Sequence, residues 1–104
     1  KIKQTIRFLA LIAGLCASVA QAANGTWTNL AGGSWPAAAN WSGGIPNATN
    51  AVADFSALNI GFNSTVTNDA TRTVGTLKFA DVAPGNNWTL TGSALTLATS
   101  SGAP

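Results

Sequence analysis

Histidine, glutamate, tyrosine and methionine are absent from this sequence of 104 residues, and cysteine occurs once, at Cys16. The acidic residues are three aspartates, Asp54, Asp69 and Asp81. A serine nucleophile needs a neighbouring base such as histidine, and each of the three aspartates stands alone in its own segment, so nothing indicates a catalytic pair of carboxylates. We therefore expect no enzyme active site within these residues.

Charge is scarce as well: charged residues make up 8% of the chain, and the formal net charge is +2. Three of the five basic residues, Lys1, Lys3 and Arg7, lie at the very start, which leaves two basic residues against three aspartates in the rest. A nucleic-acid-binding surface needs clustered lysine and arginine, so a nucleic-acid partner is excluded. With 46% hydrophobic residues, the chain is also too apolar to be a charged disordered segment.

Residues 1–22 have the layout of a secretory signal peptide. A basic start, KIKQTIR, precedes an apolar run from Phe8, and the segment ends in the small-x-small sequence Ala20-Gln21-Ala22. The apolar run is shorter than the roughly 20 residues that a membrane-spanning helix requires. We therefore predict a helical signal peptide that is cleaved after Ala22, rather than a retained anchor, and no stable membrane span after its removal. The predicted destination is the secreted medium or the outer cell surface.

Loss of Cys16 with the signal peptide leaves a chain without thiols. Disulfides, thiolate metal ligands and a cysteine nucleophile are then excluded. Acylation of Cys16, as in a lipoprotein, is the weaker alternative, because Leu15 is too bulky for the usual signal. Neither a D-x-D-x-D-G calcium loop nor a glycine-rich calcium-binding nonapeptide occurs, so we expect no metal and no cofactor.

From residue 23 onward the sequence indicates short β-strands. Threonine, valine and aromatic residues alternate, and glycine, asparagine and proline interrupt them. The one helix-forming cluster, Pro36-Ala37-Ala38-Ala39, is too short to stand alone. The predicted strands are residues 73–79, 88–91 and 95–97, with weaker ones at 51–55, 64–68 and 26–30.

Two all-β topologies fit these strands. In a small antiparallel sandwich or meander, each strand pairs with its neighbour in sequence. In a parallel β-solenoid, each strand pairs with its counterpart one coil later. Periodicity does not separate the two, but low charge, very short strands and abundant asparagine, threonine and glycine favour the start of a solenoid.

Four tryptophans mark this chain, and three of them, Trp27, Trp35 and Trp41, lie close together in sequence. An exposed indole offers a flat face for stacking on a sugar ring, so these three are candidate carbohydrate-binding residues. Alternatively, the segment from Gly25 to Pro46 covers the open end of the solenoid, with Trp35, Trp41 and Pro46 as its structural residues. The fourth, Trp88, alternates with Leu90 and is predicted to lie in the core.

The stretches GTWTNLAGGSWPAAANWSGGIPN, AVADF, ATRTVGTLKF and NWTLTGSALTL resemble the N-terminal region of bacterial autotransporter-associated β-strand repeat proteins. The resemblance covers residues 25–97 and implies a right-handed parallel β-helix passenger that is exported and then displayed or released. It implies no catalytic residues. The expected organisation is a signal peptide (1–22), a Trp/Gly/Asn-rich N-terminal cap segment (23–50) and a β-strand repeat region (51–104).

The leading functional hypothesis is therefore an exported structural or adhesive protein that contacts extracellular glycans or cell surfaces. One alternative is a carbohydrate-binding module that uses the exposed tryptophans. Another is the N-terminal part of a β-helical polysaccharide-degrading enzyme whose catalytic residues lie beyond Pro104.

Overall fold

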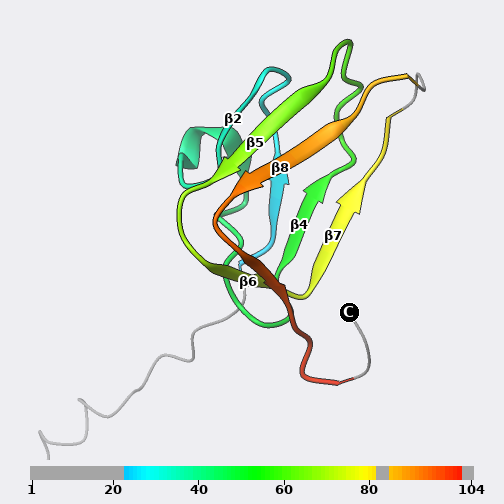
Figure 1. Cartoon of the computed structure of the whole chain (residues 1–104). Coiled ribbons are helices and arrows are strands. Elements are labelled where there is room, and N and C mark those ends of the chain that lie inside the picture. Colours follow the sequence, from blue (N-terminus) through cyan, green and yellow to red (C-terminus); the bar gives the residue numbers. More distant parts are fainter. Residues whose placement is uncertain (1–22, 82–84, 102–104) are drawn as a thin grey trace, which may run out of the picture.

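The computed structural model describes residues 23–81 and 85–101 and shows an all-β protein (Figure 1). The predicted signal peptide, with its cleavage site at Ala20 and Ala22, lies outside the described residues. The elements are β1 (Gly25–Trp27), β2 (Gly32–Ser34), the 3-10 turn η2 (Ala38–Asn40), β3 (Trp41–Ser42), β4 (Val52–Phe55), β5 (Ser64–Asn68), β6 (Arg72–Val74), β7 (Thr76–Phe79), β8 (Trp88–Gly92) and β9 (Leu95–Leu97).

The strands form three sheets. The first has the order β3-β1-β4-β7, the second β2-β5-β8 and the third β6-β9. Every pairing is parallel except that of β3 with β1, which is antiparallel, so the first sheet is mixed. The purely parallel arrangement expected of a solenoid is therefore not met at this edge. Because β1 and β2 pair with β4 and β5, the predicted cap segment (23–50) and repeat region (51–104) share their sheets.

The chain visits the three sheets in the same order twice. It passes through β4, β5 and β6, which we call the second layer, and then through β7, β8 and β9, the third layer; β1 and β2 belong to the first. Val52 pairs with Thr76 and Ser64 with Trp88, an interval of 24 residues in both sheets. Strands of the third layer therefore do not pair with one another, and the antiparallel meander is not observed in the described part of the chain.

The predicted single strand over residues 73–79 is wrong, because it divides at Gly75 into β6 and β7, which lie in different sheets. At this corner the backbone lies in close contact with the backbone around Asn50. A Cβ atom on Gly75 would lie 2.5 Å from the Cα atom of Asn50, and the Gly75 amide donates to the Ala51 carbonyl at 2.7 Å. The strand predicted at 64–68 is confirmed as β5.

Inward-facing side chains form the core between the sheets. They alternate with outward-facing ones along β4 and β5, as Ala53, Phe55 and Val66 show by being fully buried. Phe55 pairs in register with Phe79, and the two rings stack with centroids 5.1 Å apart and planes at 9°. Trp27 lies on the other side of Phe55, at 5.5 Å, so an aromatic ladder runs through all three layers.

Asparagine side chains also connect the layers. The amide oxygen of an asparagine in one layer accepts a hydrogen bond from a backbone N–H of the next, which satisfies that donor. The pairs are Asn24 with Val52 (2.9 Å), Asn47 with Thr73 (3.1 Å) and Asn63 with Asn87 (2.8 Å).

Candidate functional site

The three N-terminal tryptophans lie together in the core. Trp27 and Trp35 are fully buried and Trp41 is 7% exposed. Trp41 contacts both other rings, each with a centroid distance of 5.0 Å. Each indole N–H donates to a backbone carbonyl: Trp27 to Asn29 (2.7 Å), Trp35 to Pro46 (3.2 Å) and Trp41 to Trp35 (2.8 Å).

The premise that these three indoles expose a face for sugar stacking is wrong. A sugar needs an accessible ring face, and the faces of Trp27, Trp35 and Trp41 are covered by one another and by Phe55. The physical reason is that an indole buries more apolar surface than most other side chains, so these rings are favoured in the interior as long as each N–H finds a partner there.

The predicted cap residues Trp35, Trp41 and Pro46 are all buried beside the first layer. Trp41 begins β3, the strand that occupies the outer edge of β1. Asn40, just before it, accepts from the Thr28 amide through its carbonyl (2.9 Å), while its side-chain amide donates to the Ser34 carbonyl (3.0 Å). Backbone groups at the outer side of β1 and β2 therefore find partners in the segment that contains these residues.

The three aspartates occupy separate places. Asp54 lies on β4 and accepts hydrogen bonds from the backbone amide (2.8 Å) and the hydroxyl of Ser56. Asp69 follows β5 and forms an ion pair with Arg72 at 2.6 Å. Asp81 follows β7. Within residues 23–81 and 85–101 no group of three His, Cys, Asp or Glu side chains could hold a metal ion.

Acid is expected to destabilise the protein through two of these carboxylates. The Ser56 hydroxyl and amide lower the pKa of Asp54 below its ordinary value of 3.8, and hydrogen bonding from Arg72 lowers the pKa of Asp69 in the same direction. A lowered pKa in the folded state stabilises the fold above the unfolded value, and this stabilisation is lost as pH falls through the folded pKa. The melting temperature should therefore decline below about pH 4. Asp54→Asn should flatten this decline, as measured by circular dichroism melts from pH 5 to pH 2; an unchanged pH profile would contradict the assignment.

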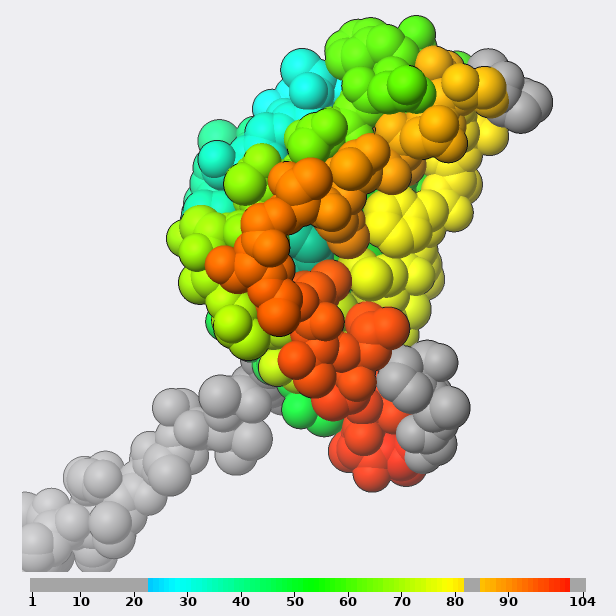
Figure 2. All heavy atoms as spheres, in the orientation of Figure 1, coloured from blue at the N-terminus to red at the C-terminus, as the bar shows by residue number. Residues whose placement is uncertain are grey.

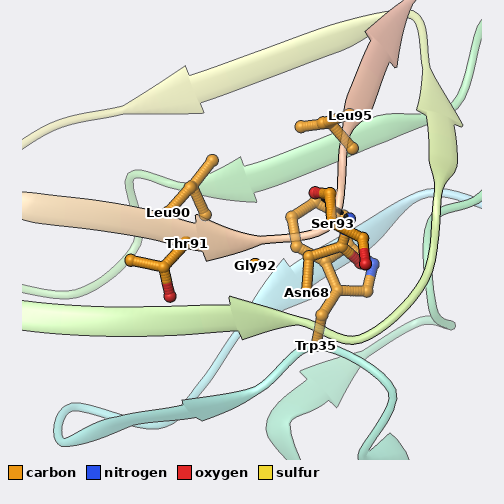
Figure 3. A pocket seen from close by; sticks show the side chains of 7 residues that line it. All are labelled: Trp35, Asn68, Leu90, Thr91, Gly92, Ser93 and Leu95. Carbon is orange, nitrogen blue, oxygen red and sulfur yellow. Dashed lines mark hydrogen bonds between the residues drawn. The ribbon is translucent and has the colours of Figure 1, made fainter.

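Two hollows lie beside the third layer. The first, of about 170 Å³, is lined by residues of β8 and the turn after it together with Trp35, Asn68 and Leu95 (Figure 3). Asn68 is 4% exposed; its side-chain amide donates to the carbonyls of Ser93 (3.0 Å) and Ala94 (3.3 Å). In the space-filling view the hollow opens among the residues of the third layer, at the centre of the visible face (Figure 2).

The second hollow, of about 280 Å³, lies between the end of β7 and the start of β8. Phe79, Asp81, Asn86 and Trp88 line it, with Ala80 and Asn87. Among the residues that the structure describes, both carboxylate oxygens of Asp81 and the indole nitrogen of Trp88 are covered and have no hydrogen-bond partner. Leaving such groups unpaired costs free energy.

The sequence pattern gives no sign of these hollows. Trp88 is predicted to lie in the core, and its ring does pack against that of Phe55 with centroids 5.4 Å apart, but the side chain is only half-buried. The alternation of Trp88 with Leu90 indicates which side chains face inward, and gives no signal of whether a further layer covers them.

Comparison with known proteins gave no match to a family model, to a curated protein or to a solved structure. Among the described residues, none of the helical segments has the length and apolar character needed to cross a membrane.

Proposed function

We propose that this chain is the N-terminal part of an exported β-solenoid with a structural or adhesive role. The single observation that carries the proposal is the repeated passage through three sheets, at an interval of 24 residues in two of them and 23 in the third, with strands of successive layers paired in parallel. Parallel connections of this kind are right-handed in almost all proteins, which agrees with the handedness implied by the resemblance to autotransporter-associated repeat passengers.

The first layer, at the N-terminal end of the three layers, supports the same function. Asn40 and β3 cover the outer edge of the first layer, as the N-terminal end of a solenoid requires if its strands are not to pair with other chains. Together with the predicted signal peptide, this arrangement suits a passenger that is secreted or displayed at the outer cell surface.

The outer face of the β2-β5-β8 sheet suits a passive role. Thr65 and Thr67 lie in register with Thr89 and Thr91, and all four are exposed and uncharged. Such a face offers hydroxyl groups for contact with extracellular glycans or cell surfaces, and it requires no catalytic group, cofactor or metal. No specific observation favours either alternative, a carbohydrate-binding module or the start of a polysaccharide-degrading enzyme.

A pair of cysteines tests the 24-residue register. Thr65 and Thr89 are exposed and directly opposite each other on neighbouring parallel strands, close enough for a disulfide. In a Cys16→Ser background, Thr65→Cys with Thr89→Cys should form an intramolecular disulfide on mild oxidation, detected as a faster-migrating species in non-reducing electrophoresis.

The matched control is Thr65→Cys with Thr91→Cys, which are displaced by two residues along the strand and should cross-link poorly. Equal cross-linking of the two pairs, or none in the first, would refute the proposed layer pairing.

A further inference from the structure

Asn24, the residue before β1, contributes a hydrogen-bond acceptor to the fold. Its side chain is exposed, and its amide oxygen accepts the backbone N–H of Val52 at 2.9 Å. Within residues 23–81 and 85–101 no group accepts a hydrogen bond from its amide nitrogen. Since the fold uses only the oxygen of this side chain, a carboxylate in the same place would serve the same bond.

Packing fixes the next residue as glycine. Gly25 is buried at the start of β1, and a Cβ atom there would overlap the carbonyl oxygen of Gly44. The same atom would lie 2.9 Å from a ring carbon of Trp41. Only glycine, which has no Cβ atom, fits so close an approach. The pairing of β1 with β4 therefore calls for an acceptor at position 24 followed by glycine at position 25.

An asparagine followed by glycine is chemically labile. The glycine nitrogen attacks the side-chain amide carbon of the asparagine, and no side chain on the glycine hinders it. The new nitrogen–carbon bond displaces the amide nitrogen, which leaves as ammonia with the proton from the glycine nitrogen, and water opens the cyclic imide to a carboxylate. Gly25 is the first residue of β1, and strand ends open locally more often than strand interiors, which gives the reaction its opportunity.

Asn68 shows the opposite arrangement. Its side chain is 4% exposed, and its amide nitrogen donates to the carbonyls of Ser93 (3.0 Å) and Ala94 (3.3 Å). The residue that follows, Asp69, carries a side chain beside the nitrogen that would have to attack. A carboxylate at position 68 would lose both bonds and face two carbonyl oxygens, so this asparagine must keep its amide.

We infer that Asn24 is a site of spontaneous deamidation in the folded chain, and that the aspartate formed keeps the hydrogen bond from Val52 and the start of β1 in place. Each converted chain gains one negative charge at this corner. The other product of ring opening, isoaspartate, lengthens the main chain before β1 and is expected to weaken the bond. The inference does not depend on the proposed function, because it needs only the pairing of β1 with β4.

The test has two parts, both on the chain recovered after export. In the first, the folded chain is incubated in mildly alkaline buffer, and peptide mapping by mass spectrometry follows the conversion of each asparagine. In the second, circular dichroism melts at neutral pH compare Asn24→Asp, the product, with Asn24→Leu, which removes the acceptor. Asn68→Asp is the matched control for a side chain that donates.

Asn24 should convert first, while Asn68 stays intact. Asn24→Asp should melt at the temperature of the unmodified chain, and Asn24→Leu and Asn68→Asp should melt lower. The inference is overturned if Asn24 keeps its amide in the folded chain over a period that converts it in urea, or if other asparagines convert as fast. A melting temperature of Asn24→Asp as low as that of Asn24→Leu would also overturn it, because the product would then not keep the bond.

Discussion

Trp35→Ala is expected to lower the free energy of unfolding by about 3–5 kcal/mol, the range typical for deleting a large buried aromatic side chain. Trp35 is fully buried against Trp41 and Phe55, and its indole N–H bonds the Pro46 carbonyl. Small domains have a total stability of about 5–15 kcal/mol, so this loss removes much of it. Urea denaturation followed by circular dichroism measures the effect.

Trp88→Ala is the control for this prediction. Trp88 is half-buried and packs on Phe55 at the edge of the core, so its removal should cost clearly less than the loss of Trp35. Adding Trp41→Ala to Trp35→Ala should cost less than the sum of the single changes, because the two rings touch. Equal midpoints for the Trp35 and Trp88 variants would contradict the interior position of Trp35.

Gly75→Ala is expected to destabilise the fold by about 1–3 kcal/mol, as overpacking does. The added Cβ would meet three backbone atoms of Asn50, at 2.5, 2.9 and 2.9 Å, and backbone cannot rotate aside as a side chain can. The layers would have to separate at this corner, which also weakens the bond from the Gly75 amide to the Ala51 carbonyl.

Gly61→Ala provides the comparison, since no atom lies within 4 Å of the position that its Cβ would occupy. Its melting temperature should stay close to that of the unmodified chain, while that of Gly75→Ala falls. Similar melting temperatures for the two variants would show that the close approach of the layers at Asn50 is absent.

Alternation and turn chemistry predicted the strands better than they predicted their pairing. The strand at 64–68 was predicted because threonine and valine cluster there, and the structure adds that Ser64, Val66 and Asn68 face inward while the threonines between them face outward. The break at Gly75 was missed, although Val74 lies out of phase with Leu77 and Phe79 and a glycine inside a strand often marks a bend. In the structure the backbone of Asn50, from another layer, lies close to Gly75 at this corner. The antiparallel strand β3, two residues long, is too short for periodicity to detect.

The candidate site could be predicted only in part. The tryptophan content indicated that residues 25–46 have a binding or a structural role, but it did not decide between the two. Whether an indole is exposed depends on which side chains pack over it, and Trp27 and Trp35 are fully buried. The second hollow brings together Asp81 and Trp88, which are seven residues apart, and nothing in the sequence pattern indicates that these side chains line a common hollow.

The layer interval also bears on how this chain tolerates changes in length. From Gly32 to its partner Thr65 the path is longer than the 24 residues between Ser64 and Trp88. The surplus is accommodated by η2, β3 and the segments around them, which add no strand to the parallel ladders. An insertion at such a corner leaves the inward and outward faces of every strand unchanged. A single residue inserted in β5 before Val66 would move Val66 to the outer face of the sheet and Thr67 to the inner face. Evolutionary drift in length should therefore accumulate at corners, while strand lengths stay fixed.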